Sequence, residues 1–420
     1  MERCVACNRV SGTVVAPSSK SFAQRGLVAA LLTRGATTLR RMTLCDDTRS
    51  ALQAVEALGV SLSREGDGYH LSSRFLEKRD LPPTLFLGES GLLFRMMAPV
   101  MALFPAETTL TGGGLLARRP IGMVESPLRV LGATLTSRDG FLPLTLRGPI
   151  RSGEVEVDGR VTSQFLTGLL MALPLLPGDS LIRVDRLHSK PYVAMTLDLL
   201  SCFGIEIEQE GYTLFHIRGG QHYRPTDYTL EGDWSAASAL LVAGCLAGEV
   251  GVTNLNLHSM QADRALLEVL DQAGACYTIL KDGLFHKVIT SRSELRAFEF
   301  DATDCPDLFP ALVALASACD GESCIKGVGR LPHKESNRGE ALCAEFTKMG
   351  IHLRIEEDVM IVRGGPVRGG VFSSHDDHRV AMALATAALR AGEPVVIREA
   401  ASVAKSYPDF WKEMEMLQQE

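Results

Sequence analysis

The first residues that could do chemistry form a short polar run at the start of an apolar segment. Lys20, Ser21 and Arg25 are expected on the first turns of a helix that Ser18 or Ser19 can cap. A helix N-terminus attracts anions because its unbonded N–H groups and its dipole carry partial positive charge. The Lys and Arg side chains add full charges, so this run predicts an anion site. It is not a P-loop, because the motif GxxxxGK[ST] does not occur.

A second basic group lies further along the chain. Gly91 is expected to open a helix where backbone N–H groups can approach a ligand closely. Pro120 suits the first position of a helix over 120–131, which would place Arg119 at the N-cap beside Arg118. Two arginines at that end oppose the helix dipole unless an anion resolves the conflict. The segment therefore predicts a second anion contact.

Neutral hydrogen-bonding side chains lead a third apolar helix. Thr162, Ser163 and Gln164 directly precede a strongly apolar run. They suit hydroxyl or phosphate oxygens, although Thr and Ser are also common helix caps. Ser189 and Tyr192 lie at the opening of the next helix. We expect this part of the chain to offer neutral contacts to a ligand.

Candidate acids and bases gather between residues 304 and 338. Asp307 is expected to enter a helix that begins at Pro306. Lys334 and Glu335 are adjacent, so they face different ways, and Arg338 lies one helical turn beyond Lys334. Paired acid and base candidates suit proton transfer. A solvated run of surface charges is the alternative interpretation of this segment alone.

A short run of His and Asp residues could suggest a metal site. His375 and His378 flank two aspartates, but a third and fourth ligand are not apparent, so we predict no metal. Arg379 lies at another expected helix start and fits the anion pattern better. Lys405 adds a basic side chain near the end of the chain.

The elements that position these residues recur along the chain. A helix that ends in glycine and is followed by a strand occurs five times, roughly 70 residues apart, which indicates repeated structural units. The five glycines are Gly59, Gly132, Gly204, Gly274 and Gly350. Each unit is expected to run β-α-β-α-β-β, with one apolar helix buried. The sixth unit stops after its second helix, and N-terminal strands within 4–10 are expected to complete it before the first unit begins at Gly12.

Six such units favour two domains over one, because single hydrophobic cores stop growing near 250 to 300 residues. We expect an α/β fold of two inside-out domains, each of three β-α-β-α-β-β repeats, joined by a two-strand hinge. One domain would comprise residues 1–18 and 230–420, and the other, inserted, would comprise residues 19–229.

Composition limits the partners of the chain. The 420 residues carry a formal net charge of −7, which argues against nucleic acid as the main partner. No apolar run reaches the 18 or so residues that span a bilayer, and residues 1–10 contain no apolar core of a signal peptide. The ten cysteines are scattered, as expected for free thiols in a reducing cytoplasm. We therefore expect a cytoplasmic protein with small-molecule ligands. Separately, we expect the protein to be a monomer.

The ordered motifs give the whole chain a resemblance to a known family, the 5-enolpyruvylshikimate-3-phosphate synthases (3-phosphoshikimate 1-carboxyvinyltransferases). These motifs are Lys20-Ser21-Phe22-Ala23-Gln24-Arg25, Gly88-Glu89-Ser90-Gly91, Arg119-Pro120-Ile121-Gly122, Ser163-Gln164-Phe165-Leu166-Thr167, Glu231-Gly232-Asp233-Trp234-Ser235, Pro306-Asp307, Lys334-Glu335-Ser336-Asn337-Arg338, Asp377-His378-Arg379 and Lys405-Ser406-Tyr407-Pro408-Asp409. The resemblance implies domains that close on two substrates, shikimate 3-phosphate and phosphoenolpyruvate. It implies transfer of the enolpyruvyl group to the 5-hydroxyl of shikimate 3-phosphate with release of phosphate, a step on the route to chorismate and aromatic amino acids. It implies no metal and no organic cofactor.

The resemblance also implies roles for individual residues. The catalytic candidates are Lys20, Asp307, Glu335 and Lys405. The implied contacts to shikimate 3-phosphate are Lys20, Ser21, Arg25, Thr162, Ser163, Gln164, Ser189, Tyr192, Asp307 and Lys334. The implied contacts to phosphoenolpyruvate are Lys20, Gly91, Arg119, Gln164, Arg338, Arg379 and Lys405. Arginine suits carboxylate and phosphate groups because its guanidinium can donate two parallel hydrogen bonds.

Several positions depart from the family pattern, and they leave other functions open. The departures are Glu89, Leu92, Leu115, Arg330, Pro332 and Asn337. An enolpyruvyl transferase acting on UDP-N-acetylglucosamine is disfavoured, because residues 115–119 lack the cysteine that such enzymes use. An RNA 3′-phosphate cyclase is disfavoured by the acidic charge and the absence of a nucleotide signature. A catalytically silent binding protein stays open because of Glu89 and Pro332.

Overall fold

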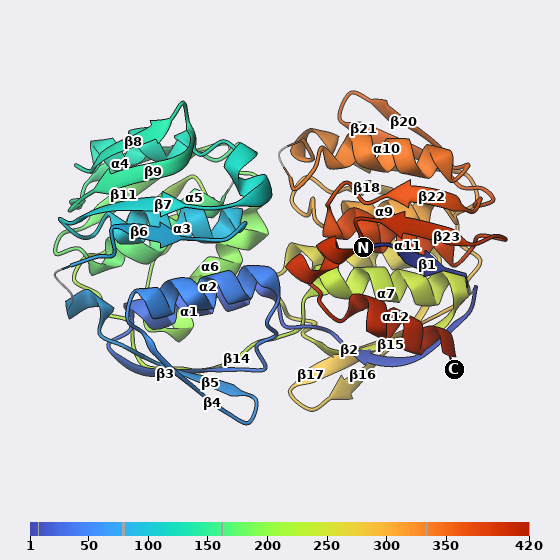
Figure 1. The fold of residues 1–420 in the computed structure, drawn as a ribbon, viewed down its shortest axis with the longest axis horizontal. Helices are drawn as coiled ribbons and strands as arrows, with labels where there is room; N and C mark the ends of the chain where they lie inside the picture. Colours follow the sequence, from blue (N-terminus) through green and yellow to red (C-terminus); the bar gives the residue numbers. More distant parts are fainter. Residues whose placement is uncertain (7, 78–79, 161–162, 333, 420) are drawn as a thin grey trace. The chain divides into compact units, whose positions relative to one another are not determined.

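The computed structural model describes residues 1–6, 8–77, 80–160, 163–332 and 334–419. By its contacts the chain divides into two units (Figure 1). We call Ser18–Leu230 the inserted unit, and Met1–Pro17 with Glu231–Glu420 the enclosing unit. The mixed α/β class predicted from the repeats is confirmed.

The inserted unit contains three repeats, each with a four-stranded sheet. Its helices are α1 (Lys20–Leu32), α2 (Asp46–Ala57), α3 (Gly91–Met101), α4 (Glu125–Val130), α5 (Gln164–Ala172) and α6 (Lys190–Cys202), with 3-10 turns η1 (Phe75–Glu77), η2 (Gly114–Arg118), η3 (Gly122–Val124) and η4 (Leu173–Leu175). Its strands are β3 (Gly35–Arg40), β4 (Ser61–Glu65), β5 (Gly68–Ser73), β6 (Thr84–Phe86), β7 (Glu107–Thr111), β8 (Thr134–Arg138), β9 (Phe141–Arg147), β10 (Glu154–Asp158), β11 (Ser180–Asp185), β12 (Glu208–Glu210), β13 (Leu214–Ile217) and β14 (Asp227–Thr229). The sheets are ordered β14-β3-β5-β4, β6-β7-β9-β8 and β10-β11-β13-β12.

The enclosing unit repeats the same plan. Its helices are α7 (Trp234–Ala247), α8 (Leu266–Ala273), α9 (Phe309–Ala316), α10 (Arg338–Lys348), α11 (His378–Ala388) and α12 (Phe410–Gln419), with 3-10 turns η5 (Ala262–Ala265), η6 (Val328–Arg330) and η7 (Ala400–Lys405). Its strands are β1 (Arg3–Val5), β2 (Val10–Val15), β15 (Gly248–Leu255), β16 (Cys276–Asp282), β17 (Phe285–Ser291), β18 (Glu299–Asp301), β19 (Glu322–Lys326), β20 (His352–Glu356), β21 (Val359–Arg363), β22 (Gly370–Ser373) and β23 (Val395–Arg398). The sheets are ordered β16-β17-β15-β2, β18-β19-β21-β20 and β1-β23-β22.

The chain exchanges strands where it passes from one unit to the other. Strand β2 precedes α1 in sequence, yet it pairs in parallel with β15 of the enclosing unit. Strand β14 precedes α7, yet it pairs in parallel with β3 of the inserted unit. The expectation that the first repeat begins at Gly12 is therefore wrong, because β14 supplies its first strand. The pattern of a single strand cannot reveal this, since the first strand of each described sheet of this plan pairs in parallel with the next in the same way.

The N-terminal segment adds one strand to the sixth sheet, so the prediction that its strands complete this sheet is confirmed in part. Strand β1 pairs with β23 antiparallel, with Arg3 opposite Ile397 and Val5 opposite Val395. The segment's second strand, β2, takes a place in another sheet of the same unit. Strand β1 thus lies beside β23 as β9 lies beside β7 in the second repeat.

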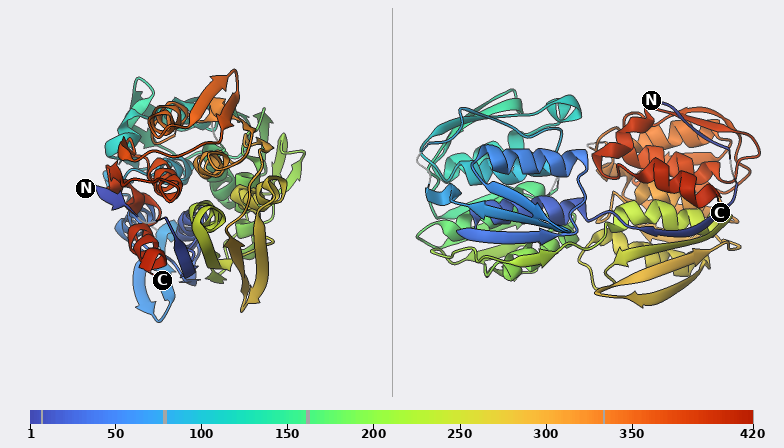
Figure 2. Two further views of the ribbon diagram at one scale, coloured as in Figure 1. Left: turned by 90° about the vertical axis from the view of Figure 1, so that its right-hand side faces the viewer. Right: turned by 60° about the horizontal axis from the view of Figure 1, so that its bottom comes forward.

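Apolar helices form the centre of each unit, which is the inside-out arrangement. All fourteen residues of α7 are buried, and α7, α9 and α11 contact one another. Figure 2 (left) shows the helices of the enclosing unit nearly end-on, with strands to their outside. Helices buried on every side carry no amphipathic stripe. Among the described residues no helix combines the length and apolarity needed to cross a membrane.

A glycine brings two helices of the inserted unit into backbone contact. A Cβ on Gly168 of α5 would lie 2.6 Å from the Arg95 carbonyl oxygen and 2.9 Å from the Met96 Cα, both on α3. Any larger residue would push these helices apart, because backbone atoms cannot retreat as side-chain tips do. The close contact sets the spacing between the first turns of α3 and α5, which carry Gly91 and Gln164.

Two predicted helix starts are wrong. The segment predicted as one helix over 120–131 is divided into η3 and the short α4, which begins at Glu125. Arg119 has an extended backbone (φ −90°, ψ 136°) and is no N-cap, so the predicted conflict with a helix dipole does not arise there. Tertiary hydrogen bonds hold the segment, since Arg95 donates to the Pro120 carbonyl at 3.0 Å and Ile121 N–H donates to Gly140.

The second difference concerns the acid of the fifth repeat. Helix α9 begins at Phe309, so Asp307 lies in the turn before it rather than within the helix. The N–H of Cys305 bonds to the Ala302 carbonyl and that of Leu308 bonds to the Cys305 carbonyl. These tight turns delay the helix, and they leave the Asp307 carboxylate outside it.

Candidate functional site

Lys20 begins helix α1 and forms a largely buried ion pair. Its Nζ lies 2.9 Å from Oδ2 of Asp47, and the two side chains are 14% and 6% exposed. The N-cap of α1 is Ser19, whose hydroxyl accepts from Phe22 N–H. Asp47 lies in the first turn of α2 and was not among the predicted site residues. Its only signal in the sequence is an acidic pair at a helix start, which is common and favourable for stability alone.

Arg25 is a buried cation surrounded by neutral oxygens. Its Nε donates to Thr196 Oγ1 at 2.9 Å, and its Nη atoms donate to the carbonyl oxygens of Ser21 and Tyr192 and to the hydroxyl of Thr167. Burial lowers the pKa of Arg25 to about 10. A buried positive charge with neutral partners is costly unless an anion compensates it.

Two arginines, Arg95 and Arg119, meet at the start of helix α3. Arg95 is buried, and its Nη1 donates to the Gly91 carbonyl at 3.2 Å and to Gln164 Oε1 at 2.9 Å. A Cβ on Gly91 would lie 2.7 Å from Arg95 Nη1 and 2.9 Å from Arg119 Nη1. Burial, and after it the charge of Arg119, lowers the pKa of Arg95 to about 9. The structure thus brings together three predicted residues, Gly91, Arg119 and Gln164.

Sequence reasoning missed Arg95 as a member of this group. Its one signal is a charged residue within an otherwise apolar helix, at the i+4 position from Gly91. In a helix that position lies on the same face as Gly91. An arginine in a fully buried helix needs a specific reason to be there, and the group at Gly91 provides it.

The neutral contacts predicted in the third repeat occupy the starts of α5 and α6. Ser163 is buried at the N-cap of α5. Ser189 is the N-cap of α6 in a left-handed conformation, with φ of 59°. The Tyr192 carbonyl accepts from Arg25 at 3.2 Å, which ties α6 to α1. Thr162 lies outside the described residues.

Asp307 is the centre of a charged cluster in the enclosing unit. Its Oδ1 lies 3.1 Å from Lys334 Nζ, 2.9 Å from Arg338 Nη1 and 3.7 Å from Arg379 Nε. Burial alone would raise the pKa of Asp307, but the three cations lower it well below its usual range. Burial lowers the pKa of Lys334, against the opposing charge of Asp307. Asp307 is therefore ionised.

Arg338 is fully buried and joins three carboxylates. It contacts Asp307, Glu335 through Nη2 at 2.9 Å, and Asp377 through Nε at 2.9 Å. Burial would lower the pKa of Arg338, but the three carboxylates, Asp377 first, raise it. The predicted acid and base candidates Asp307 and Glu335 are thus held by one guanidinium, at the N-terminus of α10.

The remaining predicted cations come from different local structures. Arg379 lies in the first turn of α11, and its Nη2 donates to the Ser235 hydroxyl at 2.6 Å. Lys405 is buried but ends η7, so it does not lie at a helix start. Ser235 was not predicted, although it belongs to the motif around Asp233 that its hydroxyl contacts.

The His and Asp run does not assemble a metal site. His375 Nε2 lies 3.0 Å from Glu345 Oε1, whereas His378 is buried at the start of α11. Across the described ranges no group of three or more His, Cys, Asp or Glu side chains is arranged to hold a metal ion. The local geometry therefore gives no support for a metal at this run.

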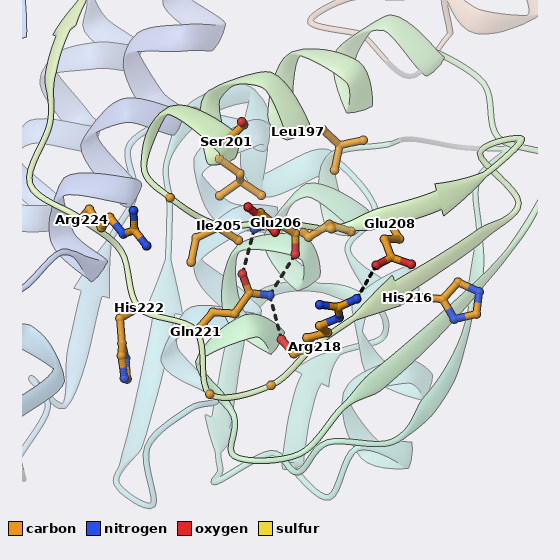
Figure 3. Close-up of a pocket in the computed structure, with 15 residues that line it drawn as sticks. Leu197, Ser201, Ile205, Glu206, Glu208, His216, Arg218, Gln221, His222 and Arg224 are labelled. Carbon is orange, nitrogen blue, oxygen red and sulfur yellow. Dashed lines mark hydrogen bonds and ion pairs between the residues drawn. The ribbon is translucent and has the colours of Figure 1, made fainter.

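A cavity of about 760 Å³ in the inserted unit lies apart from these groups (Figure 3). None of the predicted site residues lines it. The side chain of Gln221 bonds to the Glu206 N–H at 2.8 Å and to the carbonyls of Glu206 and Arg218, as Figure 3 shows. Arg218 bonds to Glu208 at 2.9 Å. Gln221 and Arg218 are thus engaged by the chain segments that border this space.

Arginines near this cavity and elsewhere cover helix ends. The backbone N–H groups of Arg224, Arg296 and Arg368 donate to carbonyl groups at the C-terminal ends of α6, α8 and α10, those of Phe203, Ala273 and Met349. A Cβ on Gly204 would lie 2.8 Å from Arg224 Cδ, and one on Gly350 would lie 3.2 Å from Arg368 Cδ. A cation at a helix C-terminus complements the dipole. Arg224 therefore has a structural role at the rim of the cavity.

Comparison with known proteins agrees with the sequence motifs. The family model for EPSP synthase (3-phosphoshikimate 1-carboxyvinyltransferase) matches residues 5–414. A 3-phosphoshikimate 1-carboxyvinyltransferase of Clostridium novyi is 34% identical over 97% of this chain and 95% of its own length. One of Yersinia pseudotuberculosis is 37% identical over 98% of this chain and 97% of its own.

Solved structures agree on the fold. An EPSP synthase of Acinetobacter baumannii superposes with a TM-score of 0.85 at 23% identity, covering 99% of this chain and 98% of its own. The enolpyruvyl transferase NikO of Streptomyces tendae superposes with a TM-score of 0.77 at 19% identity, covering 99% and 96%. The match of the family model over nearly the whole length, with relatives above 30% identity, shows that the chain belongs to the EPSP synthase family.

Proposed function

We propose that this chain transfers the enolpyruvyl group of phosphoenolpyruvate to the 5-hydroxyl of shikimate 3-phosphate and releases phosphate. The observation that carries the proposal is membership of the EPSP synthase family over residues 5–414. The charged groups of both units fit a reaction between two anions, because each unit gathers buried cations at its predicted site residues. This places the protein in the shikimate route to chorismate and aromatic amino acids.

The chemistry needs one proton acceptor and one proton donor. As the 5-hydroxyl oxygen bonds to C2 of phosphoenolpyruvate, the hydroxyl loses its proton and C3 gains one, which forms a tetrahedral ketal. The C2–O bond to phosphate then breaks while C3 gives up a proton. Asp307 and Glu335, each 2.9 Å from Arg338, are assigned as the acid–base groups. Lys20 and Lys405 are assigned to the departing phosphate.

The phosphate of shikimate 3-phosphate is assigned to Arg25 of the inserted unit. Arg25 has hydroxyl and carbonyl partners only among the described residues, so its charge is available to an anion. Ser163, Ser189 and Tyr192 lie at the starts of the neighbouring helices. Asp307 and Lys334 are assigned to the same substrate, with Lys20, Ser21, Thr162 and Gln164 completing the set.

Phosphoenolpyruvate is assigned to the remaining cations. Gly91 leaves room for Arg119 beside the start of α3, and Gln164 is oriented there by Arg95. Arg338, Arg379 and Lys405 are assigned to it from the enclosing unit, together with Lys20. Preorganised positive charge stabilises a tetrahedral intermediate with several anionic oxygens better than water does.

We further propose that the two units are the domains of the enzyme and that it acts as a cytoplasmic monomer. The nine described cysteines are free thiols, which fits a reducing compartment. Light scattering on the purified protein tests the monomer, since a mass near 45.4 kDa is expected and about twice that mass would contradict it.

A phosphate-release assay with both substrates tests the reaction. The wild-type protein should release phosphate only when both are present. Replacing Asp307→Asn or Glu335→Gln should each lower turnover by about 10²-fold or more, because each removes a proton-transfer group. Glu340→Gln is the matched control, since Glu340 is an exposed acid in the first turn of the same helix α10. A folded wild-type sample that releases no phosphate would refute the proposal.

A further inference from the structure

The turn between β22 and α11, Ser373–Asp377, has an unfavourable backbone. His375 and Asp376 are consecutive residues with φ of 54° and 56°. Residues with a Cβ rarely adopt this left-handed conformation, and two in a row persist only where the surroundings hold them. The turn directly precedes Arg379, one of the cations assigned to phosphoenolpyruvate, so what holds it has consequences for the site.

One set of contacts joins the turn to helix α10. The imidazole Nε2 of His375 lies 3.0 Å from Glu345 Oε1, and the Ser373 N–H donates to Glu345 Oε2 at 3.1 Å. Glu345 is completely buried, and Lys348 donates to its Oε1 at 2.7 Å. Burial would raise the pKa of Glu345, but these hydrogen bonds lower it. The carboxylate is ionised, so Nε2 is the protonated ring nitrogen that donates to it.

A second set of contacts joins the turn to the segment before η7. The Ser373 hydroxyl donates to Glu399 Oε2 at 2.7 Å, and the Ser374 hydroxyl donates to the Glu399 carbonyl at 3.1 Å. Glu399 is the N-cap of η7, and that short helix ends at Lys405. The turn is therefore attached to the element that carries a second assigned cation.

Asp377, the last residue of the turn, binds both Arg338 and Arg379. Asp377 is completely buried and accepts from Arg338 Nε at 2.9 Å, from the Ser336 hydroxyl at 3.1 Å and from the Arg379 N–H at 2.9 Å. It is the N-cap of α11. One five-residue turn thus connects the elements that carry Arg338, Arg379 and Lys405.

We propose that His375 is a positioning residue for phosphoenolpyruvate. By binding the buried Glu345 carboxylate it holds the Ser373–Asp377 turn, and the turn fixes the positions of Arg338, Arg379 and Lys405 relative to one another. The role rests on the proposed function, because those three cations are assigned to phosphoenolpyruvate there. His375 does not touch the substrate. It acts through Asp377 and Glu399, and it is 41% exposed at a position that looks like an ordinary surface turn.

The test compares three variants by initial-rate kinetics. His375→Ala should raise the KM for phosphoenolpyruvate about tenfold, as expected when a hydrogen bond to a charged group is lost. The KM for shikimate 3-phosphate should change by less than about threefold, because Arg379 and Lys405 are assigned to phosphoenolpyruvate alone. His375→Gln keeps an N–H donor and should recover most of the loss.

His216→Ala is the matched control for the kinetics. Its Nε2 lies 3.2 Å from Glu210 Oε1, and its ring is 45% exposed, so a histidine–carboxylate contact with an exposed partner is removed outside the turn. It should leave both KM values unchanged. Equal changes of the two KM values in His375→Ala, or no rescue by His375→Gln, would overturn the positioning role.

Hydrogen exchange gives a readout that does not depend on turnover. His375→Ala should exchange its amides at residues 374–379 at least tenfold faster than wild type, with no change in the inserted unit. Wild-type exchange there would overturn the proposal. If the wild-type protein released no phosphate, the proposed function would fail while exchange still tested the turn.

A milder variant covers the case in which His375→Ala does not fold. Ser373→Ala removes the hydroxyl that donates to Glu399 at 2.7 Å and accepts from the His375 N–H at 3.0 Å, and it retains both groups that contact Glu345. A selective rise in the KM for phosphoenolpyruvate supports the role of the turn, and a parallel rise in both KM values overturns it.

Discussion

Gly91→Ala is the substitution whose effect follows most directly from the geometry. The added Cβ would lie 2.7 Å from Arg95 Nη1 and 2.9 Å from Arg119 Nη1, where ordinary contact begins at 3.4 Å. The guanidinium groups must therefore retreat by about 0.7 Å and about 0.5 Å. They can do so because they are the far ends of flexible side chains, so the fold should survive.

The expected loss can be estimated from that displacement. A misplacement of about 1 Å can cost about 10²-fold in catalysis, so a shift of about 0.5 to 0.7 Å corresponds to roughly ten- to thirtyfold. The loss should appear in the KM for phosphoenolpyruvate, to which Gly91 and Arg119 are assigned. The KM for shikimate 3-phosphate should change less, since Arg25 and its partners do not touch Gly91.

The assay is phosphate release with each substrate varied in turn. Gly339→Ala is the matched control, because Gly339 also lies in the first turn of a helix beside an assigned arginine. A Cβ there would meet Val328 at 3.5 Å and Leu331 at 3.6 Å, which is ordinary contact. An unchanged KM for phosphoenolpyruvate in Gly91→Ala, or an equal rise in Gly339→Ala, would show that the contact with the two arginines is not what matters.

Two further substitutions test buried hydrogen bonds of the inserted unit. Thr196→Val leaves Arg25 Nε without its 2.9 Å acceptor, so it should raise the KM for shikimate 3-phosphate about thirtyfold, for a loss of roughly 2 kcal/mol. Thr196→Ser keeps the hydroxyl, and equal impairment by both variants would contradict this reasoning. Tyr223 donates to the Met171 carbonyl at 2.7 Å, and burial raises its pKa well above 10. Above pH 10 the unfolded state loses the Tyr223 proton while the folded state retains it. The stability that the buried Tyr223 hydroxyl contributes is therefore intact below pH 10 and is lost as the pH rises above it. Tyr223→Phe should therefore cost about 1 kcal/mol in urea unfolding at pH 8, and the deficit should shrink above pH 10; a deficit that does not depend on pH would count against the assignment.

The sequence predicted the repeats well because each repeat obeys local rules. Glycine after the last helical turn and apolar helices of ordinary length predict elements wherever they occur, and α3 begins at Gly91 as expected. The exchange of β2 and β14 was not predictable, because equivalent sheet edges in different repeats accept the same strand. The extended backbone at Arg119 was missed because Pro120 is equally suited to a helix start and to the loop that Arg95 holds.

Site residues were predictable where a charged side chain lies at a helix start. They were missed where the side chain's partner lies on another helix. Lys20 and Arg379 lie in first helical turns, as the pattern required. Arg95, in contrast, faces Gln164 from another helix, and that helix approaches only because Gly168 lacks a side chain. No spacing within one segment can reveal a partner that depends on the packing of two helices.

The arginines of the two units have opposite electrostatic environments, and this bears on what each can do. Burial lowers the pKa of Arg25 and Arg95, whose hydrogen-bond partners are neutral. In the enclosing unit, burial also opposes charge, yet neighbouring carboxylates raise the pKa of Arg338 and Arg379. The inserted unit thus holds positive charge that a phosphate would compensate, so it should gain the most from substrate binding. In the enclosing unit the carboxylates around Arg338 already compensate its charge, and the cations around Asp307 keep that carboxylate ionised.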